Sequence, residues 1–252
     1  MIKYLKSEKD WLTNSFYYAM FSLFFFFFMM PKLLMMLIIA CNITNEEIKV
    51  MMLVIPHQLG MLILISYIIF ISDKHIKFRE KLKLINWKNN FIWKVILLEF
   101  ILILFVPIIT YIFTLFLQYV LKIEVQQPNI NKLIMSTSYY GFAIIAFGAI
   151  IIAPLTEELL FRRVIFSFTK EKTTLIFATV FTSLIFAAIH GSLVQLPGLF
   201  ILGLAMQMLY SYHKSLIISI LFHALHNSVA MTLALLIKYL IDSGHITFPA
   251  YL

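Results

Sequence analysis

The chain has 252 residues, of which 62% are hydrophobic and only 13% are charged. Soluble domains are about 45–50% apolar and about one quarter charged, which excludes a soluble fold of this size. The formal net charge of +8 comes from basic residues that lie between long apolar runs, a pattern typical of membrane topology signals, so we expect a lipid bilayer and no nucleic acid as the partner.

The apolar runs predict an all-α fold, a polytopic membrane helix bundle of about seven to eight transmembrane helices. A span needs about 20 apolar residues, and backbone groups in lipid must be hydrogen-bonded within helices or closed barrels. The runs are continuous and do not alternate, which favours helices. The expected spans are residues 11–30 with an extension to 40, 50–71, 91–120, 139–168, 173–190, 193–210 and 216–240. Residues 121–137 are more polar and predict a loop or a short surface helix.

Basic residues recur at positions that orient the expected spans. They lie at the N-terminus, in an interfacial segment 73–90 that suits anionic lipid, and near residues 170–172 and 213–214. Cytoplasmic loops carry an excess of Lys and Arg, so the N-terminus is expected in the cytoplasm of a multi-pass cell-membrane protein. We divide the chain into N-terminal transmembrane helices, 1–137, and a C-terminal helix core, 138–240, which carries the polar motifs described below.

The first half contains few ionisable or polar groups within its spans, namely His57, Gln58, Lys94 and Glu99. Such groups are functional candidates by default because they are costly in lipid. His57, however, follows Pro56, where freed backbone carbonyls need hydrogen-bond donors. We therefore interpret this set as structural.

The second half places two adjacent carboxylates and a guanidinium in one apolar helix. Glu158 and Arg162 are four residues apart, so they share a face and can pair. Glu157 lies about 100° away around the helix and is left unpaired. An unpaired carboxyl group in a low-dielectric site suits a general acid or base.

Two further helices carry imidazole and amide groups at helical spacing. Phe186 and His190 share one helix face, and His223 and Asn227 share another, whereas His226 is rotated off that face and is expected to be structural. Counted from the basic turns, Glu157 and Asn227 are about 20 Å deep, His223 about 14 Å and His190 about 27 Å. All lie within a hydrocarbon core of about 30 Å, so convergence requires tilt or a late start of the helix that ends in His190.

The ordered motifs Glu157-Glu158…Arg162, Phe186…His190 and His223…Asn227 resemble those of the CPBP intramembrane proteases. This family is also called the CAAX prenyl protease or Abi family, and it includes bacteriocin-processing and bacteriocin-immunity proteins. The resemblance covers about residues 140–230. Many members have a glycine after the arginine, whereas this chain has Arg163.

The resemblance implies a glutamate-type endopeptidase that needs no cofactor and acts on a membrane-associated peptide or protein. Glu157, assisted by His190, would activate water, and His223 and Asn227 would stabilise the oxyanion. Glu158, Arg162 and Phe186 would support these groups. Peptide hydrolysis requires such a base and such preorganised donors.

Three other functions remain open from the residues alone. Two Glu and two His side chains could bind zinc in a metalloprotease, although the chain has no H-E-x-x-H motif and Asn is a poor ligand. A non-catalytic immunity or scaffold protein could use the same helices to bind a partner. A transporter is expected to contain an internal repeat, and none is visible.

Overall fold

The computed structural model describes residues 2–67, 91–125 and 129–246, and every regular element in these ranges is a helix. This confirms the predicted all-α fold. The expected interfacial segment 73–90 lies outside the described residues. The polar stretch before the fourth span does contain a short helix, as the sequence indicated.

In chain order, with the π-helical turns labelled η, the helices are α1 Ile2–Ser22, η1 Leu23–Met29, α2 Met30–Ala40, α3 Glu46–Ser66, α5 Phe91–Leu115, η3 Phe116–Val120, α6 Asn129–Ser136, α7 Tyr139–Phe147, η4 Gly148–Ile152, α8 Ala153–Glu158, η5 Leu159–Ile165, α9 Phe166–Lys172, α10 Leu175–Ile189, α11 Leu196–His213 and α12 Leu216–Asp242.

Seven helical runs of the described ranges correspond in order to the seven apolar segments of the sequence. Five of these runs are long and apolar enough to cross a membrane: Asp10–Ala40, Glu46–Leu64, Ile92–Val120, Tyr139–Lys172 and Leu216–Asp242. The other two are α10, with 15 residues, and α11, with 18. The first and fourth runs, which are long enough to break, are each one continuous helix containing π-helical turns.

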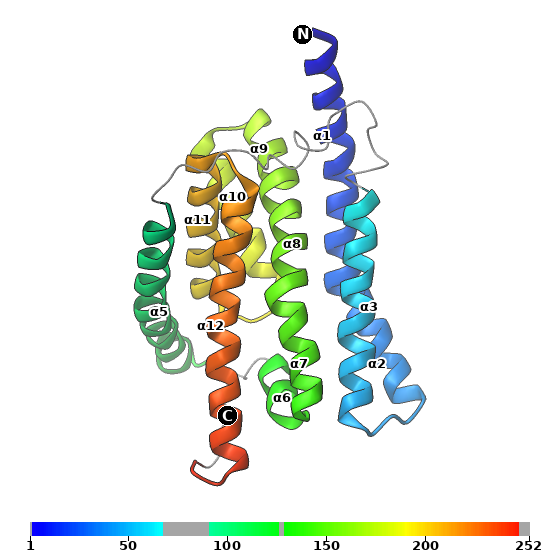
Figure 1. Ribbon diagram of the computed structural model, residues 1–252, viewed down its shortest axis with the longest axis vertical. Coiled ribbons are helices and arrows are strands. Elements are labelled where there is room, and N and C mark those ends of the chain that lie inside the picture. Colours follow the sequence, from blue (N-terminus) through cyan, green and yellow to red (C-terminus); the bar gives the residue numbers. More distant parts are fainter. Residues whose placement is uncertain (1, 68–90, 126–128, 247–252) are drawn as a thin grey trace.

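The fourth run, Tyr139–Lys172, is the central helix of the bundle. Half of its apolar window is buried (50%), against 11–17% for the other four candidate spans. It contacts α1, α3, α10 and α12 along its length (Figure 1). Polar side chains on the buried half of this run, such as Glu157, Glu158 and Arg162, are therefore held against other helices.

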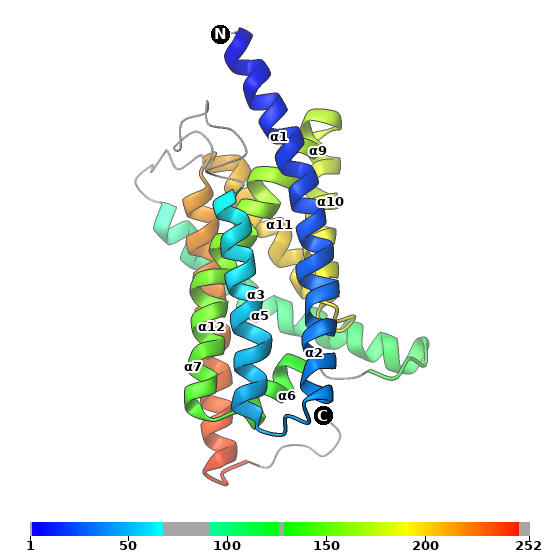
Figure 2. The same cartoon turned by 90° about the vertical axis from the view of Figure 1, so that its right-hand side faces the viewer.

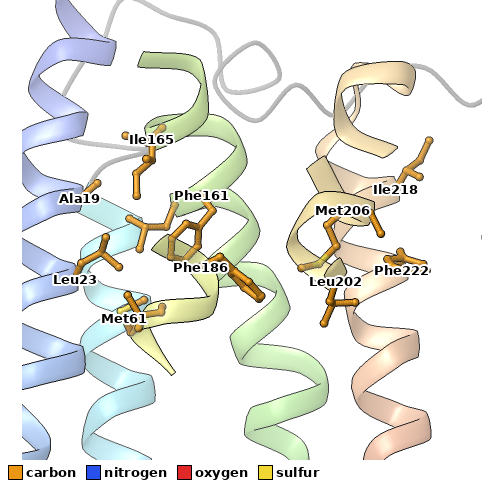
Figure 3. Packing of buried hydrophobic residues seen from close by; sticks show 14 of the residues in the cluster. Ala19, Leu23, Met61, Phe161, Ile165, Phe186, Leu202, Met206, Ile218 and Phe222 are labelled. Carbon is orange, nitrogen blue, oxygen red and sulfur yellow. The ribbon is translucent and has the colours of Figure 1, made fainter. Parts of the chain in front are cut away.

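Interlocked aromatic and aliphatic side chains hold α1, η5, α10, α11 and α12 together (Figure 3). Phe161 and Phe186 meet edge to face, with ring centroids 5.3 Å apart. Small residues bring α10 and α11 close, since a Cβ atom at Gly203 would lie 3.1 Å from the Cβ of Ser183. Van der Waals packing of this kind drives helix association in lipid, where burial from water contributes little.

Two of the basic turns that orient the expected spans can be located in the described structure relative to the N-terminus. The N-terminal end of α1, the end of α9 and the turn between α11 and α12 lie at one end, and the α2–α3 turn, α6 and the end of α12 lie at the other (Figures 1 and 2). Lys170, Lys172 and Lys214 therefore lie at the same end as the N-terminus. Lys49 and Lys238 belong to helices that begin or end at the opposite end, so the described lysines are not confined to one end, and the expected orientation of the chain stays a prediction.

Candidate functional site

Glu158 is the centre of a fully buried polar network. Arg162 Nε donates a hydrogen bond to Glu158 Oε2 over 3.1 Å, and neither side chain is exposed. The Ser219 hydroxyl on α12 donates to the same oxygen. The ion pair predicted from the four-residue spacing is thus present, and it is fastened to a second helix.

Glu157 lies on a different face of α8, as its position in the sequence indicates. Its Oε2 atom is buried and has no hydrogen-bond partner among the described residues. The Nε2 atom of His223 lies 4.0 Å from this oxygen, beyond hydrogen-bond distance. A buried acceptor that no protein group satisfies is rare and calls for a functional explanation.

His223 on α12 bridges the two glutamates. Its Nδ1 atom lies 3.1 Å from Glu158 Oε1, and its Nε2 atom faces Glu157. Because a carboxylate can only accept, we assign the hydrogen to Nδ1. The orientation of the ring toward Glu157 is therefore fixed by Glu158, which in turn is held by Arg162 and Ser219.

Phe186 connects the histidines of the two motif helices. Its ring is fully buried, with the His190 ring 5.0 Å away and the His223 ring 5.9 Å away between centroids. The Arg162 Cζ atom lies 5.2 Å from the same ring centroid, within the range of a cation–π contact. The supporting residues of the sequence prediction thus form one packed unit.

His190 lies at the C-terminal end of α10 and is exposed, whereas Glu157 and His223 are buried. Its Nδ1 atom is 2.8 Å from the Phe186 carbonyl, which accepts a hydrogen and leaves Nε2 for another partner. The helix α10 begins at Leu175, three residues after Lys172. The depth of His190 counted from Lys172 is therefore about 4.5 Å too large. The His190 ring contacts the Phe186 ring, which in turn contacts His223.

Asn227 lies one turn after His223 on α12. Its Nδ2 atom donates to the carbonyl of Ala149 over 2.6 Å, and Ala149 belongs to the π-helical turn η4. A side-chain amide has two N–H donors, so a second hydrogen remains for another acceptor. The bond also fastens α12 to the central run just before Glu157.

A cavity of about 300 Å³ opens beside Glu157, between α3, the central run and α12. His57 and Gln58 of α3 line it together with Glu157, and most of the other lining residues are apolar. The sequence-based interpretation of His57 and Gln58 as purely structural missed this location. The signal was present as two adjacent polar residues inside a span, but the direction in which α3 presents them depends on packing between helices.

Gln58 is fitted closely against the central run. A Cβ atom added at Gly148 would lie only 1.4 Å from Gln58 Nε2, so the amide fills the space that a side chain would occupy there. Gln58 and Ile152 also line a second, largely apolar groove of about 420 Å³ between α3 and the fourth run. Gln58 therefore stands where the groove and the cavity of Glu157 adjoin.

Buried Glu99 and half-buried His226 form a separate pair outside this cavity. The Nδ1 atom of His226 lies 3.0 Å from Glu99 Oε1 and 3.3 Å from Oε2, joining α12 to α5. His226 thus points away from Glu157, as the helical spacing predicts, and has a structural partner. Lys94, the other charged group of this span, is exposed.

Within the described ranges, no three His, Cys, Asp or Glu side chains are grouped so that they could hold a metal ion. Glu158 is already bound by Arg162, Ser219 and His223, which leaves it poorly suited to coordinate a cation. The residues present therefore do not fit the zinc site considered from the sequence.

Residues 139–229 match the family model described as "Type II CAAX prenyl endopeptidase Rce1-like". This match confirms, for this segment, the resemblance drawn from the three motifs. Every motif residue from Glu157 to Asn227 lies within it, while His57, Gln58 and Glu99 lie outside it.

Two curated bacterial proteins are similar to the chain. It is 36% identical over 115 residues to the "Membrane-embedded CAAX protease MroQ" of Staphylococcus aureus, covering 43% of this chain and 46% of that protein. It is 32% identical over 85 residues to the "Putative membrane peptidase YdiL" of Bacillus subtilis, covering 34% and 35%. The chain thus spans less than half the length of these relatives. No solved structure matches it.

Proposed function

We propose that the protein is an intramembrane endopeptidase that hydrolyses a membrane-associated peptide or protein with Glu157 as the general base. The observation that carries this proposal is the Glu157 carboxylate, which is buried, has an oxygen without a hydrogen-bond partner in the described structure and lines a cavity of about 300 Å³. Such a cavity has room for water and part of a substrate. The similarity to MroQ, named a membrane-embedded CAAX protease, supports proteolysis within a membrane.

In this proposal Glu157 accepts a proton from a water molecule while the water oxygen bonds to the scissile carbonyl carbon. His190 assists by accepting a hydrogen bond at Nε2 from the other hydrogen of that water, which stays on the oxygen; Nε2 is the nitrogen not used in the bond to the Phe186 carbonyl. Positioned acid–base groups of this kind contribute typically about 10²–10⁴-fold to rate.

The electrons of the carbonyl double bond move to its oxygen, and His223 and Asn227 stabilise the resulting oxyanion. With both ring nitrogens protonated, His223 donates from Nε2, which lies 4.0 Å from Glu157 Oε2. Asn227 donates its second amide hydrogen. Collapse of the intermediate breaks the C–N bond, and the proton held by Glu157 passes to the leaving nitrogen, giving a carboxylic acid and an amine.

Glu158, Arg162 and Phe186 act as positioning residues in this scheme, because they orient His223 and His190 without facing the cavity. We further propose a cell-membrane location with the N-terminus in the cytoplasm. This is supported by the position of Lys170, Lys172 and Lys214, which lie at the same end of the bundle as the start of α1. No metal or organic cofactor takes part in the proposed mechanism.

Cleavage of membrane-anchored peptides by the purified protein in detergent tests the proposal. Wild type, Glu157→Gln and His190→Ala are compared, each with and without a chelator, on one peptide panel. We expect cleavage by wild type with or without chelator, and a loss of about 10²-fold or more in both variants.

Loss of cleavage on chelation, with recovery on adding zinc, would replace the glutamate mechanism with a metal-dependent one. Unchanged cleavage by Glu157→Gln would remove Glu157 from the mechanism. If wild type cleaves nothing while Glu157→Gln still protects cells from a toxic peptide, the protein is a binding or immunity protein and not an enzyme.

A further inference from the structure

A second polar pocket lies away from the cavity of Glu157, at the end of the bundle where α9 ends and α11 turns into α12. It has a volume of about 510 Å³ and is lined by α1, the central run and α11. Residues from the two sites do not overlap. The lining combines cations, hydroxyl groups and apolar side chains, including Arg163, Phe166, Lys170, Tyr210, Ser211 and Lys214.

Arg163 provides a buried cation in this pocket. Its side chain is 1% exposed, and its Cζ atom lies 4.6 Å from the ring centroid of Trp11. The five N–H donors of a guanidinium point outward in its own plane, so a cation held over an aromatic face can serve more than one acceptor. The planar fork matches the oxygens of a phosphate group.

The charges around the pocket favour an anion. Arg163, Lys170 and Lys214 contribute three cations against the single carboxylate of Glu171. Lys170 and Lys214 are exposed, so their ammonium groups can move toward a ligand. The Ser211 hydroxyl accepts a hydrogen bond from Gln207 over 3.1 Å, which leaves its own hydrogen to donate.

The apolar part of the lining indicates that the anion is carried by a lipid. Phe166 and Leu12 are buried and belong to the same pocket wall as the charged groups. A phosphate with an attached acyl chain can contact both the cationic groups and the apolar wall of the pocket, whereas a free phosphate can contact only the cationic groups. The pocket also lies at one end of the bundle, where lipid headgroups are located, and basic pockets between transmembrane helices bind such headgroups.

We propose that this pocket binds the phosphate of an anionic membrane lipid, with Arg163, Lys170 and Lys214 as its ligands. The inference is independent of the proposed peptidase activity, because the pocket shares no residue with the catalytic cavity.

Saturable lipid binding to the delipidated full chain in neutral detergent tests this inference, measured by native mass spectrometry and by the rise in Tm. The probes are phosphatidylglycerol, phosphatidylcholine, glycerol phosphate and inorganic phosphate. Lys170→Gln/Lys214→Gln is the test variant, since both side chains are exposed and the fold does not depend on them. Lys122→Gln/Lys172→Gln is the control, with the same charge loss on two exposed lysines outside the pocket.

The two variants are also matched in backbone geometry. Each replaces one lysine with a positive φ, Lys214 (51°) in the test variant and Lys122 (53°) in the control. We expect phosphatidylglycerol to bind wild type and the control equally, and the test variant about 30-fold more weakly. Arg163→Gln should weaken binding at least as much if the variant folds.

Equal binding of phosphatidylcholine and phosphatidylglycerol would overturn the proposal, as would equal weakening in the test and control variants. Binding of inorganic phosphate as tight as that of the lipid would overturn the lipid assignment. Each outcome can be read without any cleavage assay, so it does not depend on the activity proposed for Glu157.

Discussion

The Nε2 atom of His223 lies 4.0 Å from Oε2 of Glu157. This distance is too long for a direct hydrogen bond, and it suits two groups that act on the same small ligand from different sides. Glu158 holds Nδ1 of His223 and so orients the ring toward Glu157, while Glu158 itself takes no part in the proposed chemistry.

Glu157→Gln should abolish cleavage while leaving Tm unchanged within about 2 °C, because its Oε2 atom has no protein partner in the described structure. His223→Ala should lower both activity and Tm, since it removes a hydrogen bond to buried Glu158. Parallel cleavage and thermal-unfolding measurements check this difference. A large fall in Tm for Glu157→Gln would mean that Glu157 has a structural role.

Breaking the ion pair beneath His223 should be costly for stability. Arg162→Met leaves Glu158 buried without its ion-pair partner, which we expect to destabilise the fold by about 3–5 kcal/mol. Glu158→Gln/Arg162→Met should recover part of this loss, because no charge remains buried. Denaturation in detergent measures both variants, and equal destabilisation by the single and double variants would contradict the expectation.

Asn227→Ala should reduce kcat by about 10²–10³-fold with little change in KM, as expected for an oxyanion donor. The lost bond to the Ala149 carbonyl should also cost about 1 kcal/mol of stability. Ser228→Ala is a suitable control, because Ser228 bonds only within its own helix, to the Ala224 carbonyl. If kcat of Asn227→Ala equals that of the control well below Tm, Asn227 is not an oxyanion donor.

The Gln58 amide should contribute to substrate binding from outside the matched domain. Gln58→Leu should raise KM about 5- to 10-fold through loss of one hydrogen bond to the substrate. Gly148→Ala should have a similar effect by an independent route, because the added methyl group displaces Gln58. Ile63→Ala, on the exposed face of α3, is the control. An unchanged KM in both variants would assign Gln58 to packing alone.

The pair of His226 and Glu99 should fasten α5 to the catalytic helices. His226→Leu should destabilise the protein by about 3–5 kcal/mol because it strands a buried carboxylate. Glu99→Leu/His226→Leu should be closer to wild type, and Lys94→Leu, at an exposed position of α5, should be near neutral. A double variant less stable than His226→Leu would contradict this view.

Patterns within single helices predicted much of the site. The spacing of Glu158 and Arg162 gave their pairing, and the rotation of Glu157 away from them gave its lack of a partner. The off-face position of His226 was likewise visible in the sequence. These relationships depend only on helical periodicity, which the sequence carries directly.

Contacts between helices could not be predicted in the same way. The contact of Glu158 with Ser219 and His223 depends on how α12 is rotated and shifted against the central run. The presence of His57 and Gln58 in the cavity of Glu157 depends on the same variables for α3. The helix order and the seven apolar segments were predictable because hydropathy sets them locally, whereas the relative rotations are set by side-chain fit.

The π-helical turns on either side of α8 bear on how this segment tolerates changes in length. A π-helical turn holds one more residue than the equivalent α-helical turn. Deleting one residue from Gly148–Ile152 would therefore let that turn close into an ordinary α-helix without shifting the rest of the run by a full position. Such a deletion should be better tolerated by folding than one within Ala153–Glu158, and the wider turns give the central helix a local allowance for length variation during evolution.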